Sequence, residues 1–173
     1  MQMQHTTKAG EAIQNAQKLA AESQHPELTP AHLAVSLLQA PEGVTNGVLA
    51  KLAVDPRVLA GELVLALDKL PRAEGSQLAP SRAFVETINT SADIARKLGD
   101  EYVSTEHLLL ALARKGGPEV IGLFNARKLT PERIEAALEQ VRGDKRVNSP
   151  DPEATYDTLK KYARDLTADA AAG

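Results

Sequence analysis

The chain has 173 residues and a formal net charge of −3, with acidic and basic residues spread along its length, so it presents no surface that would neutralise a nucleic-acid backbone. It contains no cysteine, which excludes disulfides and thiolate metal sites, and aromatic residues make up only 3% of it, which leaves no platform for stacking bases. No apolar run approaches the roughly 18 residues that span a bilayer and the N-terminus lacks a basic-then-apolar signal, so we expect a soluble, cytoplasmic protein with neither nucleic acid nor membrane as a partner.

Four helices are predicted in the first half of the chain. Apolar residues recur at three- and four-residue spacing from about Thr6 to Ser23, which indicates an amphipathic helix. Thr29 and Asp55 are each followed by a proline, and a capping side chain with proline at the first helical position is typical of a helix start. A short helix over about 44–53 is expected between the two helices that these residues begin, and the fourth helix is expected to reach Leu70.

A second, similar set of four helices follows a loop from Pro71 to Ala79. The first of them is expected over about 80–98, and Ser104 and Thr130 repeat the capping pattern for two later helices. A short helix that carries Phe124 lies between those two. No segment alternates in the manner of a strand, so the sequence predicts an all-α fold.

The two sets are copies of one unit. A shift of 75 residues brings His32 onto His107 (107 − 32 = 75), Pro56 onto Pro131 and Leu63 onto Leu138, without a gap. Self-similarity of this kind indicates a duplicated folding unit. We therefore expect a pseudo-twofold, duplicated four-helix repeat of about eight helices, with repeat 1 at about 5–70 and repeat 2 at about 80–142. The seam between the copies is expected to leave an apolar furrow open to a polypeptide.

The character of the sequence changes after Arg142. Residues 143–155 contain Gly, Asn, Ser and two prolines without an apolar stripe, which is typical of a linker. Residues 156–172 regain helical spacing, with Leu159, Tyr162 and Leu166 on one stripe. An amphipathic stretch beyond a linker is expected to pack on a further domain.

Several segments together resemble the ClpB protein disaggregases. They are Pro30–Leu33, Leu70–Gly75, Ser104–Leu108, Val147–Pro150 and Leu159–Thr167. The resemblance covers essentially the whole chain, in the expected order, and it implies that residues 1–142 are a Clp N-terminal domain. It further implies that 143–155 are the linker and that 156–173 are the truncated start of the first ATPase domain.

What the resemblance implies about function is the recognition of exposed apolar segments of unfolded or aggregated client proteins, for delivery to an ATPase ring. The full-length protein is then expected to be a homohexameric ATPase that uses ATP and Mg and works with a DnaK-type chaperone. The fragment itself, expected to be a monomer, lacks the Gly-x-x-x-x-Gly-Lys loop that cradles phosphates, so neither a cofactor nor enzyme activity is expected in it. The alternative is a docking domain for a folded adaptor protein, as in related Clp unfoldases. A hydrolase built on Asp100, Glu106 and His107 would lack a nucleophile and an oxyanion hole.

The resemblance also implies client-binding residues: Thr6, Asp100 and Glu106. Each has an ordinary alternative, because Thr6 suits a helix N-cap, Asp100 a solvated loop, and Glu106 a first helical turn whose macrodipole favours carboxylates. Ile94 falls at the edge of its helix stripe and is expected to form a partly exposed apolar rim beside the acids. His5 stands where the family usually carries an aromatic residue.

The matched histidines, His32 and His107, are expected to be structural. Both fall at the third position of their helix, where a neutral ring can form hydrogen bonds and a protonated ring would oppose the positive end of the helix. A metal role would need converging carboxylates or thiolates, so no metal site is predicted.

Overall fold

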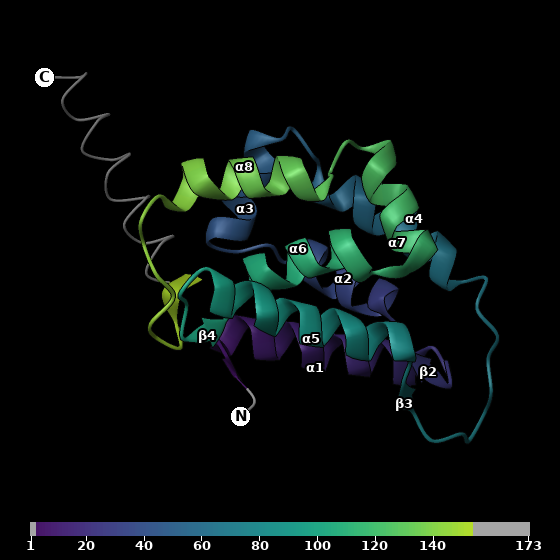
Figure 1. Ribbon diagram of the computed structural model, residues 1–173. Helices are drawn as coiled ribbons and strands as arrows, with labels where there is room; N and C mark the ends of the chain where they lie inside the picture. Colours follow the sequence, from purple (N-terminus) through teal and green to yellow (C-terminus); the bar gives the residue numbers. More distant parts are fainter. Residues whose placement is uncertain (1–2, 154–173) are drawn as a thin grey trace, which may run out of the picture.

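The structure, a computed structural model, describes residues 3–153 and holds eight helices over that range (Figure 1). Their order confirms the all-α prediction and the two sets of four. The helices are α1 (Thr7–Glu22), α2 (Pro30–Gln39), α3 (Val44–Lys51), α4 (Pro56–Leu67), α5 (Arg82–Lys97), α6 (Thr105–Lys115), α7 (Gly117–Ala126) and α8 (Pro131–Arg142). The predicted helix at 156–172 lies outside the described residues. Within 3–153, every helix is too short or too polar to cross a lipid bilayer.

The helices begin at the capping residues that the sequence indicates. Thr6 precedes α1 and its hydroxyl accepts a hydrogen bond from the N–H of Ala9 at 3.2 Å, and its counterpart Ser81 (6 + 75 = 81) accepts one from Phe84 at 3.1 Å. These bonds satisfy N–H groups that the first turn of a helix leaves without a partner. The ends are less well predicted, since α4 stops at Leu67, three residues before the expected Leu70.

The structure corrects one expectation, because the described residues include four two-residue strands where none was predicted. They are β1 (Gln4–His5), β2 (Glu27–Leu28), β3 (Ala79–Pro80) and β4 (Tyr102–Val103). β1 pairs with β4 and β2 pairs with β3, both in parallel. The strand that precedes the first helix of each copy, β1 or β3, is therefore hydrogen-bonded to a strand of the other copy. Two residues are too few to show alternation, which is why the pattern gave no sign of them.

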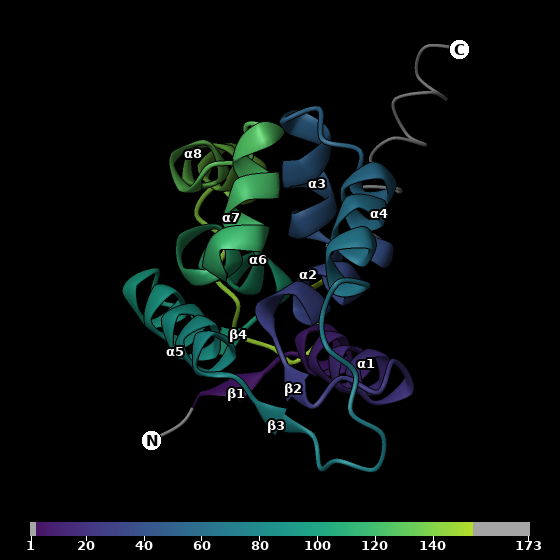
Figure 2. The same ribbon diagram turned by 90° about the vertical axis from the view of Figure 1, so that its right-hand side faces the viewer.

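The helices form three layers. α1 and α5 lie on one face, α2 and α6 form the middle layer, and α3, α4, α7 and α8 cover the other side (Figures 1 and 2). The middle helices are buried nearly all round, from Pro30 to Leu38 and from Thr105 to Ala113. A helix that is apolar on every side belongs in a core. The centre of the seam between the copies is therefore filled by α2 and α6, so the predicted apolar furrow does not run open along its whole length.

Candidate functional site

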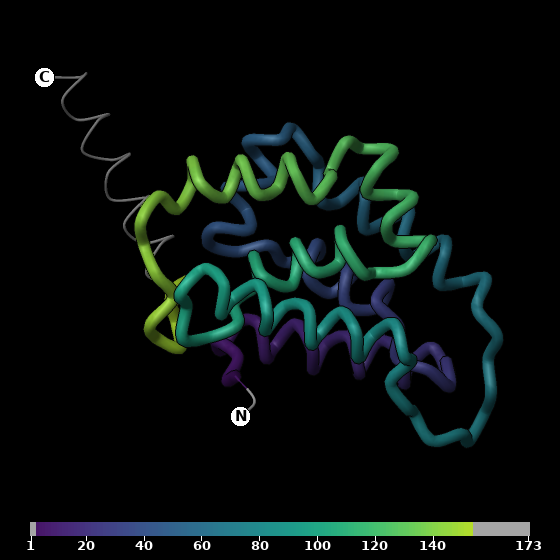
Figure 3. Tube along the Cα trace, viewed as in Figure 1, coloured from purple at the N-terminus to yellow at the C-terminus, as the bar shows by residue number. Residues whose placement is uncertain are grey.

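The segment that follows α8, residues 143–153, folds back across one end of the domain, and we call it the strap. Figure 3 shows the chain leaving α8 and returning towards the starts of α1 and α6. The N–H of Glu101 donates to the carbonyl of Val147 at 2.8 Å, and the N–H of Thr7 donates to the carbonyl of Pro150 at 2.7 Å. The side chain of Val147 is buried. The part of the predicted linker that the structure describes is thus packed against the helical domain.

Asp100 anchors the start of the strap. Its carboxylate accepts two hydrogen bonds from the guanidinium of Arg142, at 2.6 and 2.9 Å, and one from the N–H of Val147 at 2.9 Å. Arg142 also donates to the carbonyl of Lys145, so the first turn of the strap is tied to the last residue of α8. A paired, bidentate contact of this kind is geometrically specific. The expectation of a solvated loop acid is wrong, because Asp100 is buried and fully engaged.

His107 completes this cluster and its tautomer follows from its partners. The N–H of Ser104 donates to Nδ1 of His107 at 2.9 Å, so the ring proton sits on Nε2 and is donated to Asp100 at 2.7 Å. Burial lowers the pKa of His107, against the pull of Asp100. Burial alone would raise the pKa of Asp100, but the bonds from His107, Arg142 and the Val147 N–H outweigh it and hold that pKa well below its usual range. The structural role expected for His107 matches this geometry.

The far end of the strap is held by Glu153. The hydroxyl of Thr6 donates to Oε1 of Glu153 at 2.8 Å, and the N–H of Thr105, in the first turn of α6, approaches the same oxygen at 3.4 Å. The strap passes so close to Gly43 that a Cβ atom there would lie 2.8 Å from the Cα of Glu153. Thr6 is only 1% exposed, so it serves as the predicted N-cap and as the partner of a buried acid at once.

Glu106 lies beside this contact and is 2% exposed. Burial raises its pKa to about 8; Arg142 opposes the rise, whereas Glu153 and Asp100 add to it. The carboxyl of Glu106 is therefore mostly protonated at neutral pH. The sequence placed it in a first helical turn, where a charged, solvated carboxylate is the usual state. The strap removes that solvent, and burial outweighs the helix macrodipole.

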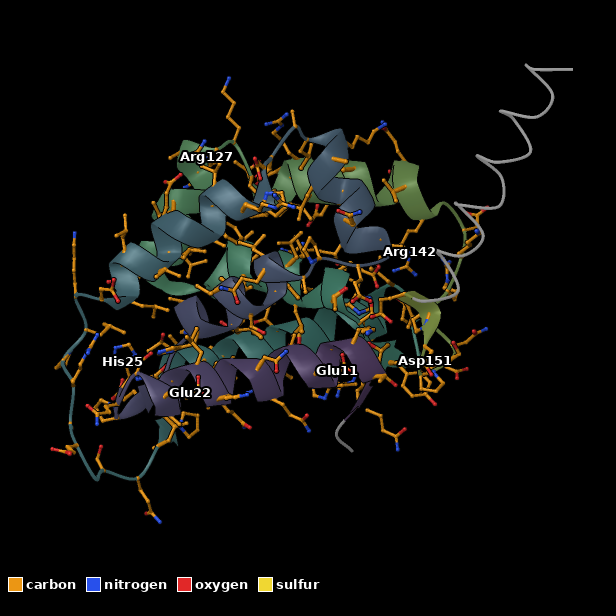
Figure 4. The ribbon with its side chains drawn as sticks, turned by 180° about the vertical axis from the view of Figure 1, so that it is seen from behind. Glu11, Glu22, His25, Arg127, Arg142 and Asp151 are labelled. Atoms are coloured by element: carbon orange, nitrogen blue, oxygen red, sulfur yellow. The ribbon has the colours of Figure 1, made fainter. Side chains whose placement is uncertain are left out.

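A cavity of about 370 Å³ opens between the strap and the helices. Its walls are mainly apolar, and Glu106 and Glu153 are the carboxyl groups that line it. Val44, Val147 and Pro152 supply apolar wall, and Lys145 and Arg146 stand at the strap side. Figure 4 shows Arg142 and Asp151 at this end of the molecule and His25 at the opposite end.

Of the four predicted site residues, Thr6, Asp100 and Glu106 lie around the strap, but only Glu106 lines the cavity beneath it. Thr6 and Glu106 lie at the end held by Glu153, and Asp100 lies at the end anchored to Arg142. Ile94 lies in the wall of another cavity, of about 390 Å³, which is lined by Leu98, Leu110 and Leu138 and also by Gly143 and Arg146 of the strap. It is 5% exposed, so the partly exposed rim expected of it is wrong: α6 packs along α5 and covers the edge of its stripe.

Sequence reasoning missed Glu153 and Arg142. Glu153 lies in a stretch without periodicity, and its partner Thr6 is 147 residues away, so no local pattern links them. A signal existed for the Asp100 cluster. The 75-residue shift places Asp100 on His25, which bonds to His32 at 2.9 Å, as Asp100 bonds to His107.

A duplicated four-helix unit with a buried histidine in each capping turn defines a class of α-helical repeat domain, and sequence comparison identifies it. Residues 4–126 match the family described as the Clp repeat (R) N-terminal domain, and the chain belongs to this family. It is 40% identical over 170 residues, 97% of its length, to the chaperone protein ClpB of Mycobacterium bovis, and 40% identical over 165 residues to ClpB of Corynebacterium efficiens. The chain spans about a fifth of the length of these relatives, in their N-terminal region.

Solved structures share the fold. The N-terminal domain of Hsp104 from Candida albicans superposes with a TM-score of 0.76 at 20% identity, over 87% of this chain and 99% of that one. A ClpV N-domain determined in complex with a VipB peptide superposes with a TM-score of 0.60 at 21% identity, over 79% of this chain and 88% of that one. The chain is thus a Clp N-terminal domain of the ClpB chaperone type.

Proposed function

We propose that this domain recognises clients for a ClpB-type disaggregase, by binding exposed apolar segments of unfolded or aggregated proteins. The observation that carries the proposal is the cavity beneath the strap, which combines apolar walls with the buried carboxyl of Glu106. Small-molecule and peptide sites commonly have this composition, with few polar groups in an apolar surround.

The protonation of Glu106 gives a physical reason for broad client recognition. A protonated carboxyl both donates and accepts hydrogen bonds. It can therefore bond the N–H or the carbonyl of an extended backbone, whatever the client's sequence. Val44, Val147 and Pro152 would contact the client's apolar side chains without demanding a particular shape.

The strap supports this proposal in a second way, because its residues 143–151 are themselves a non-helical peptide segment lying at the site. It is held by backbone bonds from Thr7 and Glu101 and by the side chain of Glu153. A client segment would lie beside it against the same helix ends. In the full-length protein, which we propose is a homohexameric ATPase acting with ATP, Mg and a DnaK-type chaperone, several domains on one ring would multiply weak affinities.

The competing function is the docking of a folded adaptor protein. It is favoured by the ClpV N-domain that was solved with a peptide from a defined protein, VipB. The two functions differ in what the cavity binds: an unstructured polypeptide in one case, and a specific folded partner in the other.

A titration of the labelled chain with an unfolded, apolar peptide, followed by NMR, tests the proposal. We expect amide shifts at Val44, Glu106 and Val147. Glu106→Gln keeps a donor and an acceptor and should bind as the wild type does, whereas Glu106→Ala should weaken binding by about 3- to 10-fold, the worth of one hydrogen bond. Glu132→Ala, an exposed first-turn acid of α8, is the matched control. No shifts with the unfolded peptide would overturn the proposal and leave adaptor docking.

A further inference from the structure

The surface on which the strap packs has a counterpart at the other end of the domain, because the fold is duplicated. The residues that approach Glu153 are Thr6, Gly43 and Thr105. The 75-residue shift gives their counterparts as Ser81 (6 + 75), Pro118 (43 + 75) and Pro30 (105 − 75). All three counterparts line one cavity, of about 220 Å³. We call it the repeat-1 pocket.

Four further residues that wall the Glu106 cavity also have counterparts in the repeat-1 pocket. The pairs are Val44 and Glu119, Glu106 and Ala31, Arg142 and Leu67, and Lys145 and Leu70. The two cavities are thus formed by equivalent positions of the two copies. Arg142 of the Glu106 cavity and His25, two residues before Glu27 of the repeat-1 pocket, lie at opposite ends of the molecule in Figure 4.

The two ends differ in what covers them. The counterpart of the strap is the loop 68–78, and of that loop only Leu70 lines the repeat-1 pocket. The loop instead bonds to the turn after α1, where the N–H of Ala73 donates to the carbonyl of Gln24 at 2.8 Å, and then continues into β3. Figure 2 shows it running away from the helices between α4 and β3. The place that Glu153 and its neighbours fill in repeat 2 has no chain segment of its own in repeat 1, within the described residues.

The chemistry of the repeat-1 pocket also differs. Ala31, Leu67 and Leu70 line it at the positions where the Glu106 cavity has three ionisable side chains, an acid and two bases. The charged residues that line it are Glu27 and Glu119, both exposed, and neither forms an ion pair with any described residue.

This composition selects one kind of occupant. A carboxylate placed in the repeat-1 pocket as Glu153 is placed at the end of the strap would lack one hydrogen bond from the backbone. Pro30 has no N–H to donate, whereas its counterpart Thr105 has one. The carboxylate would also face Glu27 and Glu119. Apolar side chains match the apolar residues that line the pocket, and a lysine or arginine beside them matches the acidic rim.

We infer that the repeat-1 pocket is a second binding position, for an extended polypeptide segment that carries apolar side chains next to a lysine or arginine. It goes beyond the function proposed at the Glu106 cavity, because this pocket lies at the other end of the domain and is not covered by the strap. A client long enough to reach both ends would contact the domain twice, and linked contacts raise the overall affinity.

An NMR titration of the 173-residue chain tests this inference. The probe is an unstructured peptide of Leu, Val and Arg, and the matched peptide has Glu in place of each Arg. We expect the Arg peptide to shift the amides of Ala31, Leu70 and Val120 and the Glu peptide to leave them unchanged. Shifts confined to the Glu106 cavity would overturn the inference and leave the proposed function intact, and shifts confined to the repeat-1 pocket would do the reverse.

Variants separate the pocket from the neighbouring surface. Ala66 is half-buried and lines the pocket, so Ala66→Trp should fill it and weaken binding there by about tenfold. Leu65, next to it on α4, is 65% exposed and does not line the pocket, so Leu65→Trp should change nothing. Should Ala66→Trp fail to fold, the surface double variant Glu27→Lys/Glu119→Lys should weaken the Arg peptide by about fivefold and strengthen the Glu peptide. An unchanged preference for the Arg peptide in the charge-reversed variant would refute the inference.

Discussion

Glu106→Gln should stabilise the domain in alkaline solution and leave it unchanged in acid. The pKa of Glu106 is raised from 4.5 to about 8, chiefly because the carboxyl is buried. Its contribution to stability is fully present below the unfolded pKa of 4.5 and is lost as the pH rises through about 8. Glutamine has the shape of the protonated acid and no charge to bury, so the variant escapes this loss.

The size of the effect follows from the shift. Each unit of pKa corresponds to about 1.4 kcal/mol, so a rise from 4.5 to about 8 sets an upper limit of roughly 5 kcal/mol on the cost of ionising Glu106 in the fold. The strap can yield and admit water beside the charge, which lowers this cost. We therefore expect the variant to gain about 2 kcal/mol at pH 9, or a rise in melting temperature of about 4–8 °C.

Thermal unfolding followed by circular dichroism at pH 5, 7 and 9 measures this. The wild type should fall in stability from pH 5 to 9 relative to the variant, and the two should differ least at pH 5. Glu132→Gln is the control, because it removes an exposed first-turn acid from α8. An equal gain for both variants, or a gain for Glu106→Gln that does not depend on pH, would refute the assignment of a buried, protonated carboxyl.

Three further substitutions test the packing around the site. Asp100→Asn leaves the guanidinium of Arg142 buried without its counter-charge and should cost about 3–5 kcal/mol in urea unfolding. Gly43→Ala brings a Cβ against the backbone of Glu153 and should speed hydrogen exchange across the strap while the core helices stay protected. Leu112→Ala opens a cavity in the fully buried middle layer and should cost about 2–5 kcal/mol.

Matched controls keep these results specific. Asp93→Asn removes an exposed ion pair with Arg96 on α5 and should cost less than about 1 kcal/mol. Leu65→Ala removes an exposed leucine and should be nearly neutral. If Asp93→Asn lowered the free energy of unfolding as much as Asp100→Asn, burial would not govern the strength of these ion pairs. If hydrogen exchange became faster across the whole domain in Gly43→Ala, the strap would not open independently of the core.

Local chemistry in the sequence predicted most of the fold. Thr6, Thr29 and Asp55 start helices because capping depends on neighbours within one turn, and the same holds for their counterparts 75 residues on. Helix ends and two-residue strands depend on contacts between the copies, so Leu67 and β1 to β4 could not be read from spacing.

The site was predicted in part, for a physical reason. Thr6, Asp100 and Glu106 were named, but their burial was not, because the strap that buries them has no periodicity to reveal that it packs. The state of Glu106 depends first on its burial and then on charges that include Glu153, 47 residues away in the chain (153 − 106 = 47), and the position of Ile94 depends on how α6 covers α5. Such contacts are decided by tertiary packing alone.

Paramagnetic relaxation tests most directly whether unfolded clients bind beneath the strap. The chain has no cysteine, so a nitroxide can be attached to a single cysteine in an unfolded apolar peptide without labelling the domain. The account predicts broadening of the amides of Val44, Glu106 and Val147, and its weakening in Glu106→Ala but not in Glu106→Gln. Broadening spread evenly over the surface, or unchanged in Glu106→Ala, would contradict it.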